Sequence, residues 1–137
     1  MDKDTLILIA GQLTKDKLSM IEMHEQLIER LGNTQEAEDY VYNEHLGKYI
    51  PILESLITKL CSCVASPTSK IDAKEYVLIA AQLRNDKNQM DKIVAEMRDY
   101  TCVVPEMPRQ EYERFIIWES ELLESLIATF QNNFQEP

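Results

Sequence analysis

The sequence repeats an aspartate–lysine pair, and paired carboxylates of this kind are candidate ligands for a cation. Asp16-Lys17 returns seventy residues later as Asp86-Lys87. Each aspartate lies on an apolar helical stripe, at a position where a hydrophobic side chain is expected. With Glu119, the two aspartates predict either a carboxylate-rich pocket for a small molecule or divalent metal, or polar contacts that fix the register of the helices.

The lysines favour the second of these two roles, because a cation at this site would compete with them for the carboxylates. We therefore expect a polar layer at the middle of the helices and no resident metal or cofactor. The predicted layer consists of Asp16, Lys17, Tyr49, Asp86, Lys87 and Glu119.

Histidine and cysteine do not add a metal motif. A di-iron helical site needs Glu-x-x-His on two helices, but Ile21 and Tyr42 stand three residues before the two histidines, His24 and His45. Cys61, Cys63 and Cys102 are expected at opposite ends of long helices, as free thiols. A glycine-rich phosphate loop and a Gly-x-Ser-x-Gly elbow are also missing from the sequence, so we expect no enzyme activity.

The elements that would position these residues come in two similar halves. When residues 1–67 are aligned with residues 71–137, 17 of the 67 pairs are identical, several times the number expected from composition. The segment LESLI at 53–57 returns unchanged at 123–127. Self-similarity at one fixed period predicts a tandem duplication.

Apolar residues spaced three and four apart predict two amphipathic helices in each half. We expect helices over 4–31, 35–64, 72–100 and 107–133, which form hairpins over 2–67 and 72–137. A single hairpin leaves its apolar stripe uncovered, so the two are expected to pack together. The prediction is an all-α protein, an antiparallel up-down-up-down four-helix bundle in one domain over 1–137.

Several residues mark the expected helix ends. Gly32 is suited to ending the first helix, and Thr34 to capping the second. Asp72 and Glu75 are spaced as a capping box for the third. Pro105 and Pro108 mark the turn into the fourth helix. Pro51 is expected to bend the second helix.

Some apolar residues fall outside the predicted seams. Leu8 and its repeat partner Leu78 lie nearly opposite the stripe on their helices. The run from Phe115 to Trp118 is continuously apolar, which is typical of a helix covered on more than one side. These positions predict an interaction surface that consists of Leu8, Leu78, Ile117 and Trp118.

The net charge of −10 limits the choice of partner. It repels nucleic-acid phosphates and anionic lipid, so no direct nucleic-acid or membrane partner is expected. Neither an export signal nor an apolar stretch of membrane-spanning length is visible, and the cysteine number fits a reducing compartment, so we expect a cytoplasmic protein.

These patterns favour a noncatalytic protein–protein interaction module, such as an acidic regulator, an inhibitor or immunity-type protein, or an adaptor. Its partner would be a protein with a basic patch, or a second copy in a homodimer. Two alternatives remain open: a carboxylate-rich bundle that binds a small molecule or divalent metal, and a nucleic-acid mimic that occupies a basic protein.

Overall fold

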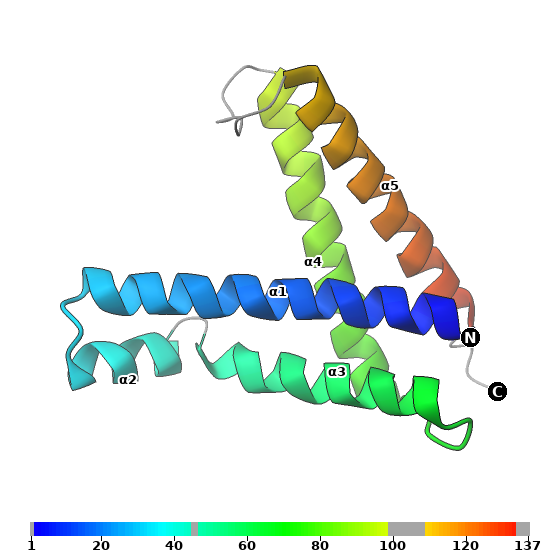
Figure 1. Ribbon diagram of the computed structural model, residues 1–137, viewed down its shortest axis with the longest axis horizontal. Coiled ribbons are helices and arrows are strands. Elements are labelled where there is room, and N and C mark those ends of the chain that lie inside the picture. The colour runs from blue at the N-terminus through cyan, green and yellow to red at the C-terminus, as the bar shows by residue number, and fades with distance from the viewer. Residues whose placement is uncertain (1, 45–46, 99–108, 134–137) are drawn as a thin grey trace. The chain divides into compact units, whose positions relative to one another are not determined.

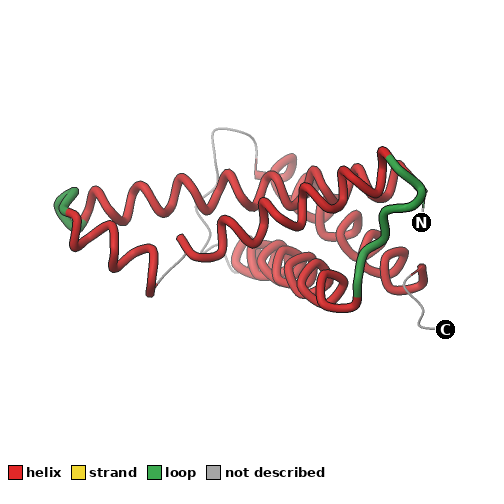
Figure 2. The backbone as a smooth tube through the Cα atoms, turned by 90° about the horizontal axis from the view of Figure 1, so that it is seen from below, coloured by secondary structure: helices red, strands yellow, loops and turns green. Residues whose placement is uncertain are grey.

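The computed structural model describes residues 2–44, 47–98 and 109–133. Within these ranges the protein is all-helical, and Figure 2 shows the described backbone as helices joined by loops. This confirms the predicted all-α class. The chain divides into two compact units, the first Asp2–Asp72 and the second from Ala73 onward, and each unit is described by itself.

The first unit contains three α-helices and one short 3-10 helix. Helix α1 covers Lys3–Arg30, α2 covers Gln35–Glu44, the 3-10 helix η1 covers Gly47–Tyr49, and α3 covers Ile50–Ala65. Helix α1 is about 42 Å long. Helices α2 and α3 both pack against it, with α3 making most of the contact (Figure 1).

The second unit is a two-helix hairpin. Helix α4 covers Ala73–Arg98, and α5 covers Arg109–Asn133 and packs along it (Figure 1). The guanidinium of Arg109 donates a hydrogen bond of 2.7 Å from Nη2 to the carbonyl oxygen of Met97. This bond ties the start of α5 to the last turn of α4, where unpaired carbonyl groups favour a cation.

Local sequence signals set both ends of α1 and the start of α2. Asp2 caps α1 by accepting a hydrogen bond of 2.7 Å from the Thr5 backbone N–H, which lowers the pKa of the Asp2 carboxyl. At the other end Gly32 has a φ of 100°, and the N–H of Asn33 returns to the carbonyl of Ile28, the geometry of a Schellman motif.

Thr34 caps α2 as predicted, because its Oγ1 accepts a hydrogen bond of 3.1 Å from the Ala37 backbone N–H. The expected capping pair of Asp72 and Glu75 stays a prediction. Both proline positions of the predicted turn, Pro105 and Pro108, lie outside the described residues.

The expected helix over 35–64 is wrong as a single element. The described part of this segment consists of α2, η1 and α3, with Pro51 in the first turn of α3 after Tyr49, the N-cap residue. Proline is favoured in a first helical turn because the N–H that it lacks has no partner there. Pro51 therefore begins a new helix instead of bending a continuous one.

The two units bury the same repeat positions. Ile9, Leu13, Leu53, Leu56 and Leu60 are buried in the first unit. The residues seventy positions later are buried in the second unit, and they are Ile79, Leu83, Leu123, Leu126 and Phe130. The Phe130 ring stacks on Tyr76 of α4, with their centroids 4.9 Å apart. Helix α2 adds Ala37 and Val41 to the first core.

None of the described helices has both the length and the apolar character needed to cross a membrane.

Candidate functional site

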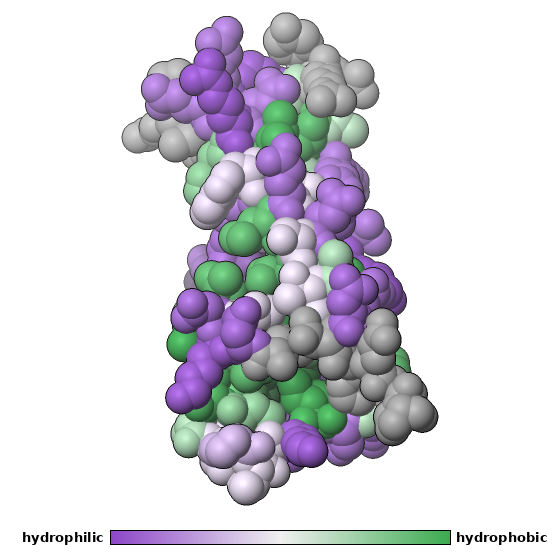
Figure 3. Space-filling model, turned by 90° about the vertical axis from the view of Figure 1, so that its right-hand side faces the viewer, coloured by the Kyte–Doolittle hydropathy of each residue, from purple (hydrophilic) through white to green (hydrophobic). Residues whose placement is uncertain are grey.

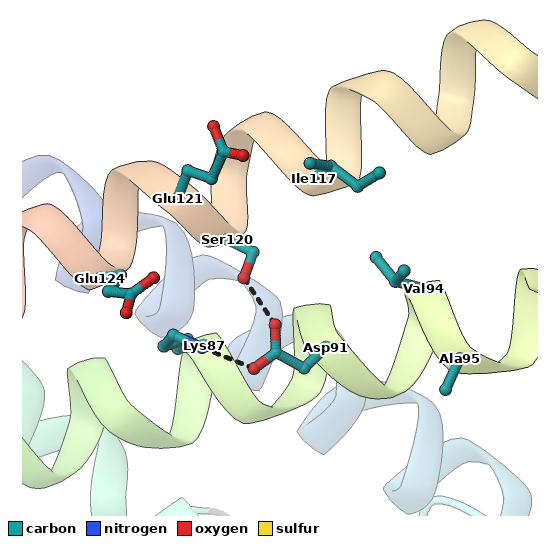
Figure 4. Close-up of a pocket in the computed structure, with 8 residues that line it drawn as sticks. All are labelled: Lys87, Asp91, Val94, Ala95, Ile117, Ser120, Glu121 and Glu124. Carbon is teal, nitrogen blue, oxygen red and sulfur yellow. Dashed lines mark hydrogen bonds and ion pairs between the residues drawn. The ribbon is translucent and has the colours of Figure 1, made fainter.

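A groove lies between α4 and α5 in the second hairpin. Its volume is about 390 Å³. Figure 4 shows the side chains of both helices around it. The lining residues are Lys87, Asp91, Val94 and Ala95 from α4, and Ile117, Ser120, Glu121 and Glu124 from α5.

Three of these side chains form a hydrogen-bonded chain across the groove. The buried Ser120 hydroxyl donates to Asp91 Oδ1 at 2.6 Å, and Lys87 Nζ donates to Asp91 Oδ2 at 2.6 Å (Figure 4). The hydrogen bond from Lys87, and then that from Ser120, lowers the pKa of the Asp91 carboxyl below its ordinary value of 3.8. The bond to Asp91 raises the pKa of Lys87, and the charges of Asp91 and Glu124 act in the same direction.

These bonds change the basicity of the two charged groups. The lowered pKa makes the Asp91 carboxylate a weaker base, and the raised pKa of Lys87 favours its protonated form. The hydrogen bond between Asp91 and Ser120 also links α4 to α5.

The shifted pKa values predict a pH window for the contribution of the Lys87–Asp91 pair. A lowered pKa for Asp91 gives stability that is present above 3.8 and is lost as the pH falls through the folded value. A raised pKa for Lys87 gives stability that is lost only as the pH rises through its folded value, above 10.5. The Lys87 and Asp91 side chains are 26% and 48% exposed, so solvent screens the attraction between their charges.

We expect a double-mutant cycle with Lys87→Met and Asp91→Asn to give a coupling of about 0.3–0.5 kcal/mol at pH 7. The free energy of unfolding would be measured by denaturant titration at several pH values. The coupling should decrease as the pH falls below 3.8 and through the lower folded pKa of Asp91. A coupling that is absent at pH 7 would show that the hydrogen bonds are not as described.

The groove also has an apolar part and an acidic edge. Ile117 and Val94 approach one another from the two helices, and Glu121 stands on α5 at the edge of the groove (Figure 4). A second hollow of about 330 Å³ adjoins this groove and shares Lys87 and Glu124 with it. The lining of that hollow is completed by Arg84, Ile127, Ala128 and Gln131.

Residues that are identical in the two halves make corresponding contacts. The Gln12 amide donates to Asp16 Oδ1 at 3.4 Å, and the Gln82 amide donates to Asp86 Oδ1 at 3.2 Å. Lys17 Nζ lies 3.9 Å from Glu54 Oε1. At the equivalent positions of the second hairpin, seventy residues later, the charge of Glu124 raises the pKa of Lys87. The helices of both hairpins therefore pair in the same register.

The predicted polar layer is placed as follows. Asp86 is buried, with 4% of its surface exposed, whereas Asp16 and Glu119 are half-buried. Tyr49 is exposed, and the ammonium of Lys48 lies 5.4 Å from the centre of its ring. Among the described residues, histidine, cysteine and acidic side chains do not gather in groups of three that could hold a metal ion.

The predicted interaction surface is divided between the units. Leu8 belongs to the first hairpin, whereas Leu78, Ile117 and Trp118 belong to the second. Trp118 is 57% exposed, and its ring centroid lies 6.3 Å from that of Phe115, which is 47% exposed. Leu8 and Leu78 are also exposed. On the face in Figure 3, hydrophobic side chains reach the surface among hydrophilic ones.

Ile117 and Trp118 do not share a face. Neighbouring residues of an α-helix lie about 100° apart around its axis, so consecutive side chains diverge. Ile117 is half-buried and lines the groove, while Trp118 pairs with Phe115 one turn away on another flank of α5. We call the exposed pair of Phe115 and Trp118 the aromatic pair.

The remaining metal-binding residue types are scattered. Among the described residues, Cys61 and Cys63 near the end of α3 form no disulfide, and Cys102 and His45 lie outside the described residues. His24 is half-buried on α1, and its buried Nδ1 has no hydrogen-bond partner among the described residues.

Comparisons with known protein families, curated proteins and solved structures gave no match to this chain.

Proposed function

We propose that the protein is a noncatalytic interaction module that binds a partner protein through the aromatic pair on α5. The observation that carries this proposal is the exposure of Trp118 and Phe115 side by side. Isolated exposed apolar residues are common on soluble proteins. Two adjacent aromatic rings are less easily explained, because each can bury 150–250 Å² in a contact, and tryptophan is a frequent anchor of interfaces.

The charge of α5 supports a basic partner. The helix carries five glutamates and two arginines, and the whole chain has a net charge of −10. Acidic side chains around an apolar pair raise the encounter rate with a basic surface and disfavour a second copy of the same acidic chain. A regulator, an inhibitor or an adaptor in the cytoplasm fits these properties.

The shared register of the two hairpins and their matching buried positions support a tandem duplication as the origin of the fold. The packing of both hairpins into one antiparallel four-helix bundle stays a prediction from the sequence. The lowered pKa of Asp91 supports the noncatalytic assignment, because it makes the carboxylate that is bonded to Ser120 a weaker base.

Replacing Trp118 with alanine is expected to weaken partner binding by about thirtyfold or more, the effect of losing an interface anchor worth about 2 kcal/mol. Tagged wild-type and Trp118→Ala proteins would be used for affinity capture from lysate of the cells that produce the protein, with bound proteins quantified by mass spectrometry. At least one protein should be strongly depleted from the Trp118→Ala sample.

The control for this experiment is Tyr42→Ala, which removes an aromatic ring that is 49% exposed on α2 in the other hairpin. This variant should retain the captured protein, and circular dichroism should show equal helix content in all three samples. If Trp118→Ala and wild type capture the same proteins in the same amounts, the proposal is wrong.

A further inference from the structure

The groove between α4 and α5 is lined by residues that differ between the two halves of the chain. Asp91 and Ser120, which are hydrogen-bonded in the second hairpin, correspond to Ile21 and Ile50 in the first. Ile117 and Glu121 correspond to Gly47 and Pro51, where the first hairpin has η1 and the start of α3. The residue types that line the groove at these four positions are therefore particular to the second hairpin.

The polar residues at this position add little to the core. A pair of isoleucines at the same register would bury more apolar area, whereas the Asp91 side chain stays 48% exposed and the buried Ser120 hydroxyl is satisfied by its bond to Asp91. The chain nevertheless carries Asp91 and Ser120, and their mutual hydrogen bond keeps the groove wall polar between Ile117 and Glu124 (Figure 4).

The charges around the two adjoining hollows are unequal. Three carboxylates, Asp91, Glu121 and Glu124, line them together with two cations, Arg84 and Lys87, and the Lys87 ammonium is hydrogen-bonded to Asp91. Glu121 and Glu124 are exposed and stand one turn apart on α5. Beside them Ile117 and Val94 form the apolar part of the lining, so an occupant should combine positive charge with apolar side chains.

We propose that this groove seats a basic amphipathic segment of the partner protein, with its Lys or Arg residues against Glu121 and Glu124 and its apolar residues on Ile117 and Val94. The two adjoining hollows extend over Arg84–Ala95 of α4, about 16 Å, which matches about eleven helical residues of such a segment. The inference rests on the proposed function and adds a second contact on another flank of α5 from the aromatic pair.

Charge disfavours the other occupants. A second copy of this chain brings a further −10 charges toward the acidic edge, and phosphate groups of nucleic acid or lipid would be repelled by the same carboxylates. A basic protein segment complements the charge of the groove, and no lining residue has to change its protonation state.

The test is a titration of the full-length, isotope-labelled protein with a synthetic peptide of about 14 residues built of leucine and lysine at helical spacing. The amide chemical shifts are expected to change at Val94, Ile117 and Glu121. A peptide with glutamate in place of every lysine should cause no change. The double variant Glu121→Lys/Glu124→Lys should weaken binding of the lysine peptide by about tenfold or more.

The matched control is Glu22→Lys/Glu25→Lys on α1, which reverses two exposed glutamates at the same spacing and changes the net charge equally. It should alter the affinity by less than about threefold. Glu121→Gln alone is a milder variant, expected to weaken binding by about threefold, and it keeps the test valid if the double variant fails to fold.

Three outcomes would overturn the inference. Equal weakening by both double variants would mean that only the overall charge attracts the peptide. Weakening by Trp118→Ala, with no effect of the glutamate substitutions, would place the peptide on the aromatic pair and would leave the proposed function standing. No binding of the lysine peptide would contradict the groove assignment directly, while the capture experiment with Trp118→Ala would still decide the proposed function by itself.

Discussion

Replacing Phe130 with alanine is expected to lower the free energy of unfolding by about 3–5 kcal/mol, the range for removing a fully buried aromatic ring. Phe130 has no exposed surface and stacks on Tyr76, so its loss would leave a cavity and an unpaired ring between α4 and α5. Denaturant titration followed by circular dichroism would measure the change. A loss this large is a substantial part of the stability of a small protein.

Phe115→Ala provides a control with the same chemistry on the same helix. Its ring is 47% exposed, so the expected loss is about 1 kcal/mol or less. Both variants remove a phenylalanine ring from α5, so the difference between their losses measures the effect of burial and not that of residue type. If Phe115→Ala proves as damaging as Phe130→Ala, then α5 does not present the faces described, and the aromatic pair belongs to a core.

Leu13→Ala and Leu83→Ala are expected to destabilise the protein by about 2–5 kcal/mol each, because both leucines are fully buried. They stand seventy residues apart at equivalent positions of α1 and α4. If the two halves use this position in the same way, the two losses should agree within about 1 kcal/mol. The free energies would be obtained from the same denaturant titrations, with Leu18→Ala, an exposed position of α1, as the control.

A negligible loss for either buried leucine would contradict the equivalence of the two cores. A loss for Leu18→Ala as large as that for Leu13→Ala would contradict the assigned face of α1. Either result would remove the packing evidence for a duplication and leave only the sequence identities.

The helices were predictable from the sequence because each has a strong apolar stripe and recognisable ends. The expected segment 4–31 corresponds to α1 at Lys3–Arg30, and the predicted cap at Thr34 is confirmed by its hydrogen bond to Ala37. Gly32 ends the helix through its positive φ, as a glycine at this position favours. In these cases local chemistry and the apolar pattern point to the same boundary.

The break before α3 was not predicted, although the signals were present. The apolar stripe continues through Tyr42, Tyr49 and Leu53, and periodicity alone does not distinguish a bent helix from two successive helices. Gly47 and Pro51 stand four residues apart, and a proline in a first turn costs far less than one inside a helix. Reading the two residues together would have favoured a new helix start.

The groove was also missed, because Asp91 and Ser120 are 29 residues apart and form no motif. Their proximity depends on the register of α4 against α5, and the spacing of apolar residues along each helix does not determine that register. A signal was nevertheless available in the repeat, since both positions are isoleucine in the first half. By contrast, Trp118 is exposed, as its position on the helix favours, whereas Ile117 is half-buried because adjacent residues of a helix point in different directions.

The proposal that the aromatic pair is the contact with a partner protein is tested most directly by crosslinking at position 118. A photoreactive phenylalanine analogue would replace Trp118 in the cells that produce the protein, and a second variant would carry it in place of Tyr42, a comparably exposed aromatic residue on α2. After irradiation we predict one discrete crosslinked product from position 118 and none from position 42. No product from position 118, or the same products from both positions, would contradict the proposed function.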